Sequence, residues 1–248
     1  YLLGHQLDSV MNYPFRSAIM NYVMGGSPFE FRNAVMTILE NYPKPSVDVL
    51  MNSISTHDIE RAINILGGES CEGKDKDWMC NHWLNDREYE LGKNRMKCAM
   101  ALQYFLPGVP CIYYGDEAGV QGYKDPFNRR CYPWGKEDKG LIEYVKLLAE
   151  VRNSSKVFID GKMKFLYMDD NVISFARTRS HRKRAMIIYV NRSPYEQVID
   201  STKTAVKDTP YYRTIHGDIV YGERLILPPY GFAAIKVEMP LDDEKDGE

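Results

Sequence analysis

The stretch Val47-Asp-Val-Leu-Met-Asn-Ser-Ile-Ser-Thr-His-Asp-Ile-Glu-Arg61 decides how this chain is interpreted. Its first part, Val47 to Met51, is a short apolar run of the kind that forms a buried strand. Serine and threonine follow, and then an imidazole and a carboxylate, His57 and Asp58, stand side by side. Side chains at the carboxyl ends of parallel strands line the active sites of α/β barrels. The stretch therefore predicts a strand that presents His57 and Asp58 at a cleft.

A second segment, Pro110-Cys-Ile-Tyr-Tyr-Gly-Asp-Glu117, has the same design. A short apolar run ends in two carboxylates, Asp116 and Glu117. Two strand ends that carry acidic residues predict one acid-lined cleft, in which these carboxylates resemble a general acid/base pair.

The composition is that of a globular protein. The chain has 248 residues, of which 44% are hydrophobic and 27% charged, and its formal net charge is −2. This charge gives no case for binding nucleic acid or a membrane surface. No apolar run approaches the roughly 20 residues that span a bilayer. Five cysteines without C-x-x-C spacing favour reduced thiols in a cytoplasmic protein, and no histidine spacing indicates a metal site.

Apolar periodicity predicts alternating strands and helices in the first 155 residues. Three strand–helix pairs imply a parallel sheet with right-handed crossovers. Ser27-Pro28-Phe29-Glu30 is interpreted as a capping box that opens a helix stopped by Pro43. Leu7 to Phe15 is predicted as a strand that leads into a loop, and Val47 to Met51 and Cys111 to Tyr114 as two further strands. After the helix that starts at Pro28, a short helix is predicted to end near Ile65, and two more helices run over 86–106 and 141–152, with a polar loop over 67–85.

The period changes near residue 156. Seven short β-type runs separated by turn residues predict an antiparallel β-sandwich. The chain is thus divided into three βα units over residues 1–155, a β domain over 156–240 and an acidic, disordered tail over 241–248. The β-type runs are Met163 to Tyr167, Val172 to Thr178, Ala185 to Val190, Tyr195 to Ile199, Tyr211 to Ile215, Glu223 to Leu227 and Phe232 to Val237.

Three βα units cannot close a barrel, because closure needs every strand. The chain starts Tyr-Leu-Leu-Gly, without an initiator methionine. We therefore expect a piece of a longer parent protein, or a chain that covers its open strand edges by self-association.

Four ordered motifs resemble the C-terminal half of an alpha-amylase-family glycoside hydrolase of the neopullulanase and cyclomaltodextrinase type. The resemblance covers nearly the whole chain. The motifs are Leu7-Asp-Ser-Val-Met-Asn-Tyr-Pro-Phe15, Asn52-Ser-Ile-Ser-Thr-His-Asp-Ile-Glu-Arg61, Pro107-Gly-Val-Pro-Cys-Ile-Tyr-Tyr-Gly-Asp-Glu-Ala-Gly119 and Gly122-Tyr-Lys-Asp-Pro-Phe-Asn-Arg-Arg130 with Tyr132-Pro-Trp134.

The resemblance implies about the sixth to eighth strands of a (β/α)8 TIM barrel, followed by a β-sandwich domain. It implies a parent that is a retaining hydrolase of α-glucans such as starch, maltodextrin, cyclodextrin or pullulan. Asp58 would stabilise the transition state and His57 would contact the same sugar, with Asp125, Arg129 and Tyr13 in substrate binding. The nucleophilic Asp and the acid/base Glu would lie upstream, so the isolated chain is expected to be inactive. No cofactor is implied, although some relatives bind calcium.

Structural interpretations compete with each of these roles. Asp58 could be a helix N-cap, Asp125 and Arg129 a plain loop salt bridge, and Tyr13 ordinary packing, as could Trp78, Trp83 and Trp134. The resemblance makes Asp116 and Glu117 shaping residues of a loop rather than catalysts. For the whole protein, the alternatives are a non-catalytic amylase-like or carbohydrate-binding protein and a glycosyltransferase of the same family.

Overall fold

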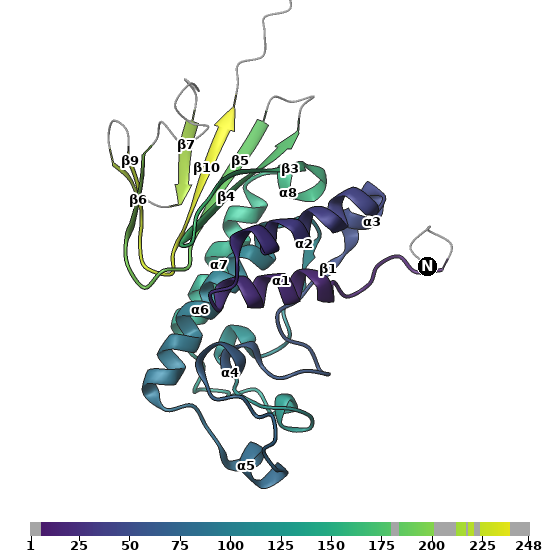
Figure 1. The fold of residues 1–248 in the computed structure, drawn as a ribbon, viewed down its shortest axis with the longest axis vertical. Helices are drawn as coiled ribbons and strands as arrows, with labels where there is room; N and C mark the ends of the chain where they lie inside the picture. Colours follow the sequence, from purple (N-terminus) through teal and green to yellow (C-terminus); the bar gives the residue numbers. More distant parts are fainter. Residues whose placement is uncertain (1–5, 180–183, 201–211, 217, 221–223, 239–248) are drawn as a thin grey trace, which may run out of the picture. The chain divides into compact units, whose positions relative to one another are not determined.

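The computed structural model describes residues 6–179, 184–200, 212–216, 218–220 and 224–238 (Figure 1). The chain divides into two compact units. Unit 1 comprises residues 1–104 and 108–150, and unit 2 comprises 105–107 and 151–248. The tail expected over 241–248 lies outside the described residues.

Unit 1 contains a small parallel sheet. Strand β1 (Met51–Asn52) pairs in parallel with β2 (Val109–Pro110). On the other side of β1, Met11 forms an isolated parallel bridge with Met51, and the amide of Met51 donates to the carbonyl of Val10 at 3.0 Å. The expected parallel order of three chain segments is therefore confirmed, although each pairing is very short.

The first predicted strand is mostly wrong. Helix α1 (Tyr13–Val23) occupies the end of the segment predicted as a strand over Leu7 to Phe15. Asn12 caps this helix, since its side-chain oxygen accepts a hydrogen bond from the amide of Phe15 at 3.2 Å. Pro14 lies in the first turn, where its missing N–H costs nothing. The remaining pairing with β1 is the bridge of Met11 to Met51, whose hydrogen bonds are made by Val10 and Asn12.

The predicted strand over Val47 to Met51 is also wrong in most of its length. Residues Lys44–Val49 form helix α3, with Pro45 in its first turn. The Lys44 Nζ atom lies 2.6 Å from a carboxylate oxygen of Asp48, one turn along the helix. The strand begins only at Met51. In the third predicted strand, Cys111 to Tyr114, β2 ends at Pro110 before the segment begins.

Helix α2 (Pro28–Asn41) is close to its predicted position. Ser27 is its N-cap residue, but the Ser27 side chain makes no capping hydrogen bond, so the predicted capping box is wrong. A reciprocal capping box exists elsewhere in the chain. The amide of Glu88 donates to the Asn85 side chain, and the amide of Asn85 donates to the Glu88 carboxylate, both at 3.0 Å.

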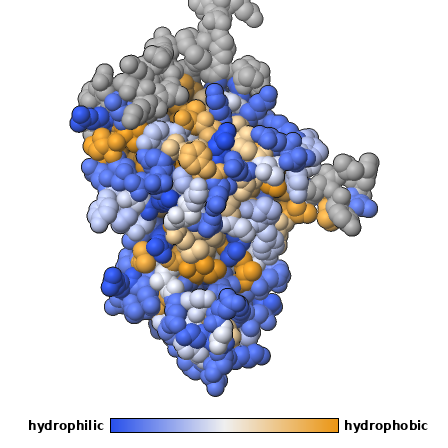
Figure 2. Space-filling model, viewed as in Figure 1, coloured by the Kyte–Doolittle hydropathy of each residue, from blue (hydrophilic) through white to orange (hydrophobic). Residues whose placement is uncertain are grey.

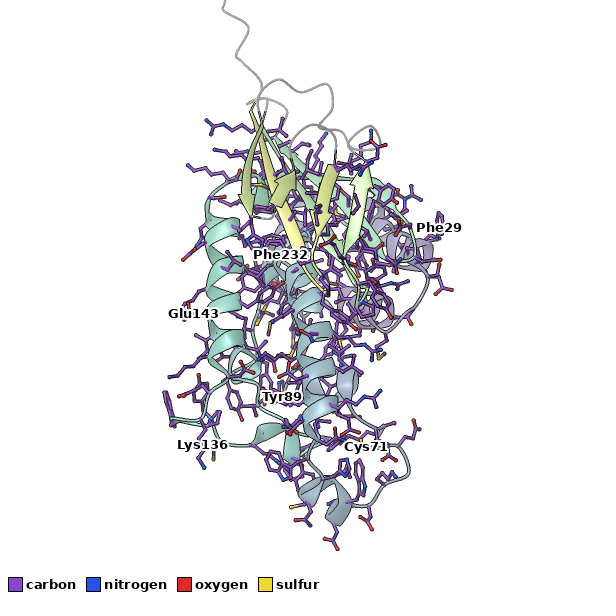
Figure 3. The ribbon with its side chains drawn as sticks, turned by 90° about the vertical axis from the view of Figure 1, so that its left-hand side faces the viewer. Phe29, Cys71, Tyr89, Lys136, Glu143 and Phe232 are labelled. Carbon is purple, nitrogen blue, oxygen red and sulfur yellow. The ribbon has the colours of Figure 1, made fainter. Side chains whose placement is uncertain are left out.

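This capping box opens the long helix α6 (Asp86–Phe105), which confirms the helix predicted over 86–106. Helix α4 (Ala62–Gly67) approaches α6 closely, because a Cβ atom on Gly67 would lie 2.2 Å from the carbonyl oxygen of Glu88. Tyr89 projects from α6 in Figure 3 and donates to Asp138 at 3.1 Å. Helix α5 (Lys76–Asn81) lies within the segment predicted as a polar loop. Two 3-10 turns follow α6, at Asp116–Ala118 and Phe127–Arg129. Helix α7 (Lys139–Asn153) ends three residues beyond residue 150, the last residue of unit 1.

Unit 2 has the antiparallel character expected from the sequence. A five-stranded sheet has the order β3-β4-β5-β10-β7 and a three-stranded sheet the order β6-β9-β8. The described pairings within both sheets are antiparallel. The bounds are α8 (Val157–Asp160), β3 (Lys162–Met168), β4 (Val172–Arg179), β5 (Arg184–Asn191), β6 (Gln197–Asp200), β7 (Tyr212–His216), β8 (Asp218–Val220), β9 (Arg224–Leu227) and β10 (Phe232–Glu238).

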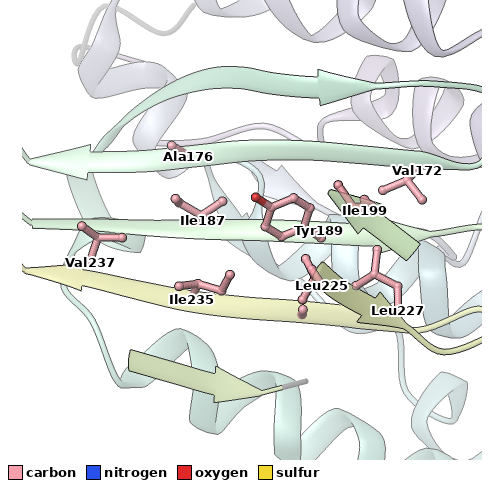
Figure 4. Close-up of a cluster of buried hydrophobic side chains, with 10 residues drawn as sticks. Val172, Ala176, Ile187, Tyr189, Ile199, Leu225, Leu227, Ile235 and Val237 are labelled. Atoms are coloured by element: carbon pink, nitrogen blue, oxygen red, sulfur yellow. The ribbon is translucent and has the colours of Figure 1, made fainter. Parts of the chain in front are cut away.

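The two sheets of unit 2 share one apolar core. Ile199 from β6 and Leu225 and Leu227 from β9 belong to the same buried cluster as Tyr189 from β5 and Ile235 from β10 (Figure 4). Alternate residues of each strand supply this cluster, as expected for sheets packed face to face. Strand β8 and helix α8 were not predicted.

The surface seen in Figure 2 is largely hydrophilic, with smaller apolar patches between the charged side chains. Within the described ranges, every helix is too short or too polar to cross a membrane.

Candidate active site

His57 and Asp58 lie together in the loop that follows β1. Their side chains are 57% and 59% exposed, and the His57 Nε2 atom lies 3.2 Å from a carboxylate oxygen of Asp58. Helix α4 begins at Ala62 with Arg61 as its N-cap residue, so Asp58 does not cap it. The pair is thus open to solvent, and both side chains have hydrogen-bonding capacity that a polar ligand can use.

The backbone of this loop is tied to nearby hydroxyl groups. The amide of Asp58 donates to Thr56 Oγ1 at 3.2 Å. Thr56 Oγ1 also lies 3.1 Å from the Tyr13 hydroxyl on α1. At the end of the loop, the amide of Ala62 donates to Ser55 Oγ at 2.9 Å. Tyr13 therefore reaches the loop through Thr56, and its side chain remains 36% exposed.

The loop after β2 also contacts the His-Asp loop. Arg129 Nε lies 2.7 Å from a carboxylate oxygen of Asp125 and donates to the carbonyl of His57 at 3.2 Å. Its neighbour Asn128 is buried and donates through Nδ2 to the carbonyls of His57 and Ile59, at 2.8 and 2.9 Å. The structure thus joins the five residues singled out from the sequence in one continuous set of contacts.

Arg61 supports this set from the interior and is fully buried. Its Nε atom donates to the carbonyl of Asn128 at 2.8 Å, and its Nη1 atom lies 3.1 Å from a carboxylate oxygen of Asp116. The guanidinium also lies over the Tyr113 ring, 4.1 Å from its centroid. A hydrogen-bonded and ion-paired guanidinium of this kind fixes the geometry of the segments that it joins.

Sequence reasoning missed Asn128 and underrated Arg61. Both residues stand inside motifs quoted above, but those motifs do not indicate the contacts that the two side chains make. The partners of the Arg61 and Asn128 side chains lie 53 to 71 positions away along the chain, so no local pattern predicts them. A lone asparagine between Phe127 and Arg129 gives no signal that would predict this role.

Asp116 lies inside the protein rather than at the cleft surface. It is 2% exposed and faces Arg61. Burial raises the pKa of Asp116 to about 6, although the Arg61 guanidinium beside it acts in the opposite direction. This position favours a role in shaping the loop over a role in proton transfer to a ligand.

The raised pKa of Asp116 makes stability depend on pH. A carboxyl whose folded pKa is about 6, against an ordinary value of 3.8, favours folding most below pH 3.8 and loses this contribution as the pH rises through 6. Relative to Asp116→Asn, the wild-type free energy of unfolding should therefore fall by roughly 2 kcal/mol between pH 4 and pH 7. Urea unfolding of both proteins across this range measures the difference. A difference that stays constant with pH would contradict the shift.

The tryptophans differ in their surroundings. Trp78 stacks on His82, with ring centroids 4.0 Å apart, and Arg130 lies over the Trp83 ring at 3.8 Å. Trp134 is 82% exposed beside Tyr132. Within the described residues there is no group of three His, Cys, Asp or Glu side chains that could hold a metal ion.

Comparison with known proteins assigns the family. The model of the alpha-amylase catalytic domain matches residues 1–159 of this chain. The chain belongs to the alpha-amylase family. This confirms the resemblance inferred from the four motifs.

Curated relatives of this alpha-amylase-family chain are named as glycan hydrolases. The amylopullulanase of Thermoanaerobacterium saccharolyticum is 33% identical over 244 residues, which cover 89% of this chain and 18% of the relative. The cyclomaltodextrinase of Geobacillus thermopakistaniensis is 29% identical, covering 96% of this chain and 38% of the relative. The chain therefore spans less than a fifth of the first relative and well under half of the second.

Solved structures have the same fold. A cyclic alpha-maltosyl-(1→6)-maltose hydrolase from Arthrobacter globiformis, in complex with that cyclic sugar, aligns with a TM-score of 0.74 at 20% identity, covering 96% of this chain and 46% of the other. An acarbose-soaked debranching enzyme from Nostoc punctiforme aligns with a TM-score of 0.72 at 22% identity, covering 96% and 48%.

Proposed function

We propose that this chain is the C-terminal half of a retaining hydrolase of α-1,4- or α-1,6-linked glucans. In this proposal, unit 1 supplies the sixth to eighth strands of a (β/α)8 barrel, and unit 2 is the β-sandwich that follows them. The supporting observation is the exposed His57–Asp58 pair just beyond the parallel strand β1, in a chain of the alpha-amylase family. Ligands bind at this end of such strands.

Each residue of the pair has a distinct role in this mechanism. A retaining glycosidase uses one carboxylate as nucleophile and a second as acid and then base. Asp58 is a third carboxylate, which accepts hydrogen bonds from sugar hydroxyls that strengthen as the ring distorts toward the oxocarbenium-like transition state. His57 donates to the same sugar. The nucleophile and the acid/base come from the part of the parent that precedes the sixth strand.

The relatives support the choice of an α-glucan as substrate. They are named amylopullulanase, cyclomaltodextrinase and neopullulanase. The proposed chemistry uses carboxylates and an imidazole and needs no organic cofactor, while calcium in the parent is left open. On the ground of its five free cysteines, we place the protein in the cytoplasm.

Asp125 and Arg129 are proposed to bind a sugar unit next to the scissile one. Their ion pair is about half exposed, and Arg129 also contacts the His57 carbonyl. Asp125→Asn in the full-length protein should raise KM for maltohexaose about fivefold, the loss of one exposed hydrogen bond, with kcat changed less than about twofold. Initial rates over a substrate series test this. An unchanged KM would leave the pair as a loop salt bridge.

A non-catalytic amylase-like protein is the alternative from another class. Retention of both His57 and Asp58 argues against it, because a protein released from catalysis need not keep the sugar-contacting pair. Incubation of the full-length protein with starch, pullulan and β-cyclodextrin, with reducing ends measured, tests the proposal. We expect turnover with α-anomeric products on at least one substrate. Binding of these glucans without turnover would favour the non-catalytic alternative. Product formation that depends on a glucan acceptor in place of water would indicate a glycosyltransferase, whose retaining mechanism gives the same anomeric form.

The chain by itself is expected to self-associate. Its short parallel sheet has outer segments at Met11 and β2, and Val109 in β2 is 45% exposed. A backbone N–H or C=O group of a strand edge that is buried without a partner costs about 1–3 kcal/mol. We therefore expect these edges to pair with a second copy of the chain. Light scattering over a concentration series should show dimers or larger species. A clean monomer at millimolar concentration would contradict this expectation.

A further inference from the structure

We propose that Asn128 is a positioning residue that, together with Thr56, fixes the peptide unit from which the Asp58 side chain projects. The inference rests on the proposed function, because it gives Asn128 a part in presenting His57 and Asp58 to a sugar. It adds a residue that would act through the pair without touching the substrate.

The contacts surround a single peptide unit. The carbonyl of His57 and the amide of Asp58 belong to the same planar group. Asn128 Nδ2 donates to that carbonyl at 2.8 Å, and the amide donates to Thr56 Oγ1 at 3.2 Å. Side chains therefore hold both the carbonyl and the amide of this peptide unit. Rotation of the peptide would move the Asp58 side chain, and it must break at least one of these hydrogen bonds.

Asn128 also holds the next bend of the chain. The same amide nitrogen donates to the carbonyl of Ile59 at 2.9 Å. A side-chain amide has two N–H groups, so it can serve both carbonyls at once. The carbonyls on either side of Asp58 are thus drawn to one point, which fixes the bend of the chain at this residue.

Asn128 is itself firmly placed. It is fully buried, and its backbone carbonyl accepts a hydrogen bond from Nε of the fully buried Arg61 at 2.8 Å. Asp58, by contrast, is 59% exposed, and the His57 side chain, whose Nε2 atom lies 3.2 Å from the Asp58 carboxylate, is 57% exposed. The position of an exposed carboxylate depends on its backbone, which here is held by Asn128 and Thr56. Arg129 also donates to the His57 carbonyl, at the longer distance of 3.2 Å, but Arg129 is itself about half exposed.

The test uses the full-length protein and Asn128→Ser, a neutral change that leaves no group able to bridge both carbonyls. We expect kcat on a maltooligosaccharide to fall about 10- to 100-fold, because small displacements of catalytic groups cost up to about 100-fold. The matched control is Asn81→Ser, which removes a comparable donor to the carbonyl of Asp77 in helix α5 and should leave kcat unchanged.

A double-mutant cycle separates positioning from damage to the fold. In an Asp58→Asn background, assayed with an activated maltosyl substrate, Asn128→Ser should lower kcat less than about threefold, because its effect passes through Asp58. Equal losses in both backgrounds would show a merely structural role and overturn the inference. Thr56→Val, which keeps the side-chain volume, should give the same pattern and serves if Asn128→Ser does not fold.

The outcomes distinguish this inference from the proposed function. Near-full activity of the Asp58→Asn single variant would contradict both the proposed function and this inference. Loss of activity in Asp58→Asn, with unchanged kcat in both Asn128→Ser and Thr56→Val, would overturn the positioning role and leave the proposed function standing.

Discussion

Replacing Asp58 by asparagine in the full-length protein is expected to lower kcat by about 10²- to 10⁴-fold while the fold stays intact. In the proposed mechanism the carboxylate accepts hydrogen bonds that strengthen in the transition state, and the loss of such a charged contact costs about 3–5 kcal/mol. The Asp58 side chain is 59% exposed, and substitutions at exposed positions usually change stability by less than about 0.5 kcal/mol. Initial-rate kinetics and thermal unfolding of both proteins measure the two effects.

Asp77→Asn is a suitable control, because this exposed carboxylate lies in the first turn of α5, outside the loops that hold the His–Asp pair. It should retain full activity. His57→Ala should lose less kcat than Asp58→Asn and show part of its loss in KM, since an uncharged sugar contact is made in the ground state as well. If Asp58→Asn keeps nearly full activity, the carboxylate has no catalytic part.

Element types were predictable from the sequence for the long helix α6 and for most strands of unit 2, although β8 was not predicted. In unit 2, turn residues separate the β-type runs and support their interpretation as strands. The apolar runs of unit 1 were mostly misassigned, because a run of five residues can be either a strand or about one and a half turns of helix. Most of the run from Val47 to Met51 belongs to helix α3 instead of a strand. This helix is stabilised by Pro45 in its first turn and by the Lys44–Asp48 ion pair.

The residues of the candidate site also differ in how well the sequence predicts their roles. His57 and Asp58 were visible in the sequence, because they follow an apolar run and belong to a local motif. Arg61 and Asn128 also stand in quoted motifs, but their roles were not visible, because these roles come from tertiary contacts between residues 67 and 71 positions apart along the chain. The carboxylates Asp116 and Glu117 drew attention as an acid/base pair, yet Asp116 is buried against Arg61. Whether Asp116 can act as an acid or base depends on its burial, and the burial of a loop residue cannot be predicted from the loop sequence.

The isolated chain of 248 residues is expected to hydrolyse neither starch nor pullulan nor cyclodextrins. The motifs that it contains resemble those of the sixth to eighth barrel strands, whereas the family's nucleophile and acid/base belong to the fourth and fifth. Removal of a single nucleophile or base can cost on the order of 10⁶ in kcat, and removal of both leaves no covalent route to the products. Retention of His57 and Asp58 would not compensate, because the role proposed for Asp58 is to stabilise a transition state that other groups must generate.

Purified chain, with its folded state checked by circular dichroism, should release no reducing ends above the level of its own Asp58→Ala variant over a day. The same preparation of the full-length parent serves as the positive control. Background turnover that is equal in both chains would come from a contaminating hydrolase. Turnover that disappears in the Asp58→Ala variant would mean that residues of this chain supply the nucleophile and the acid themselves. The correspondence of its strands with the sixth to eighth would then be wrong, because no chain confined to those strands holds the family's catalytic carboxylates.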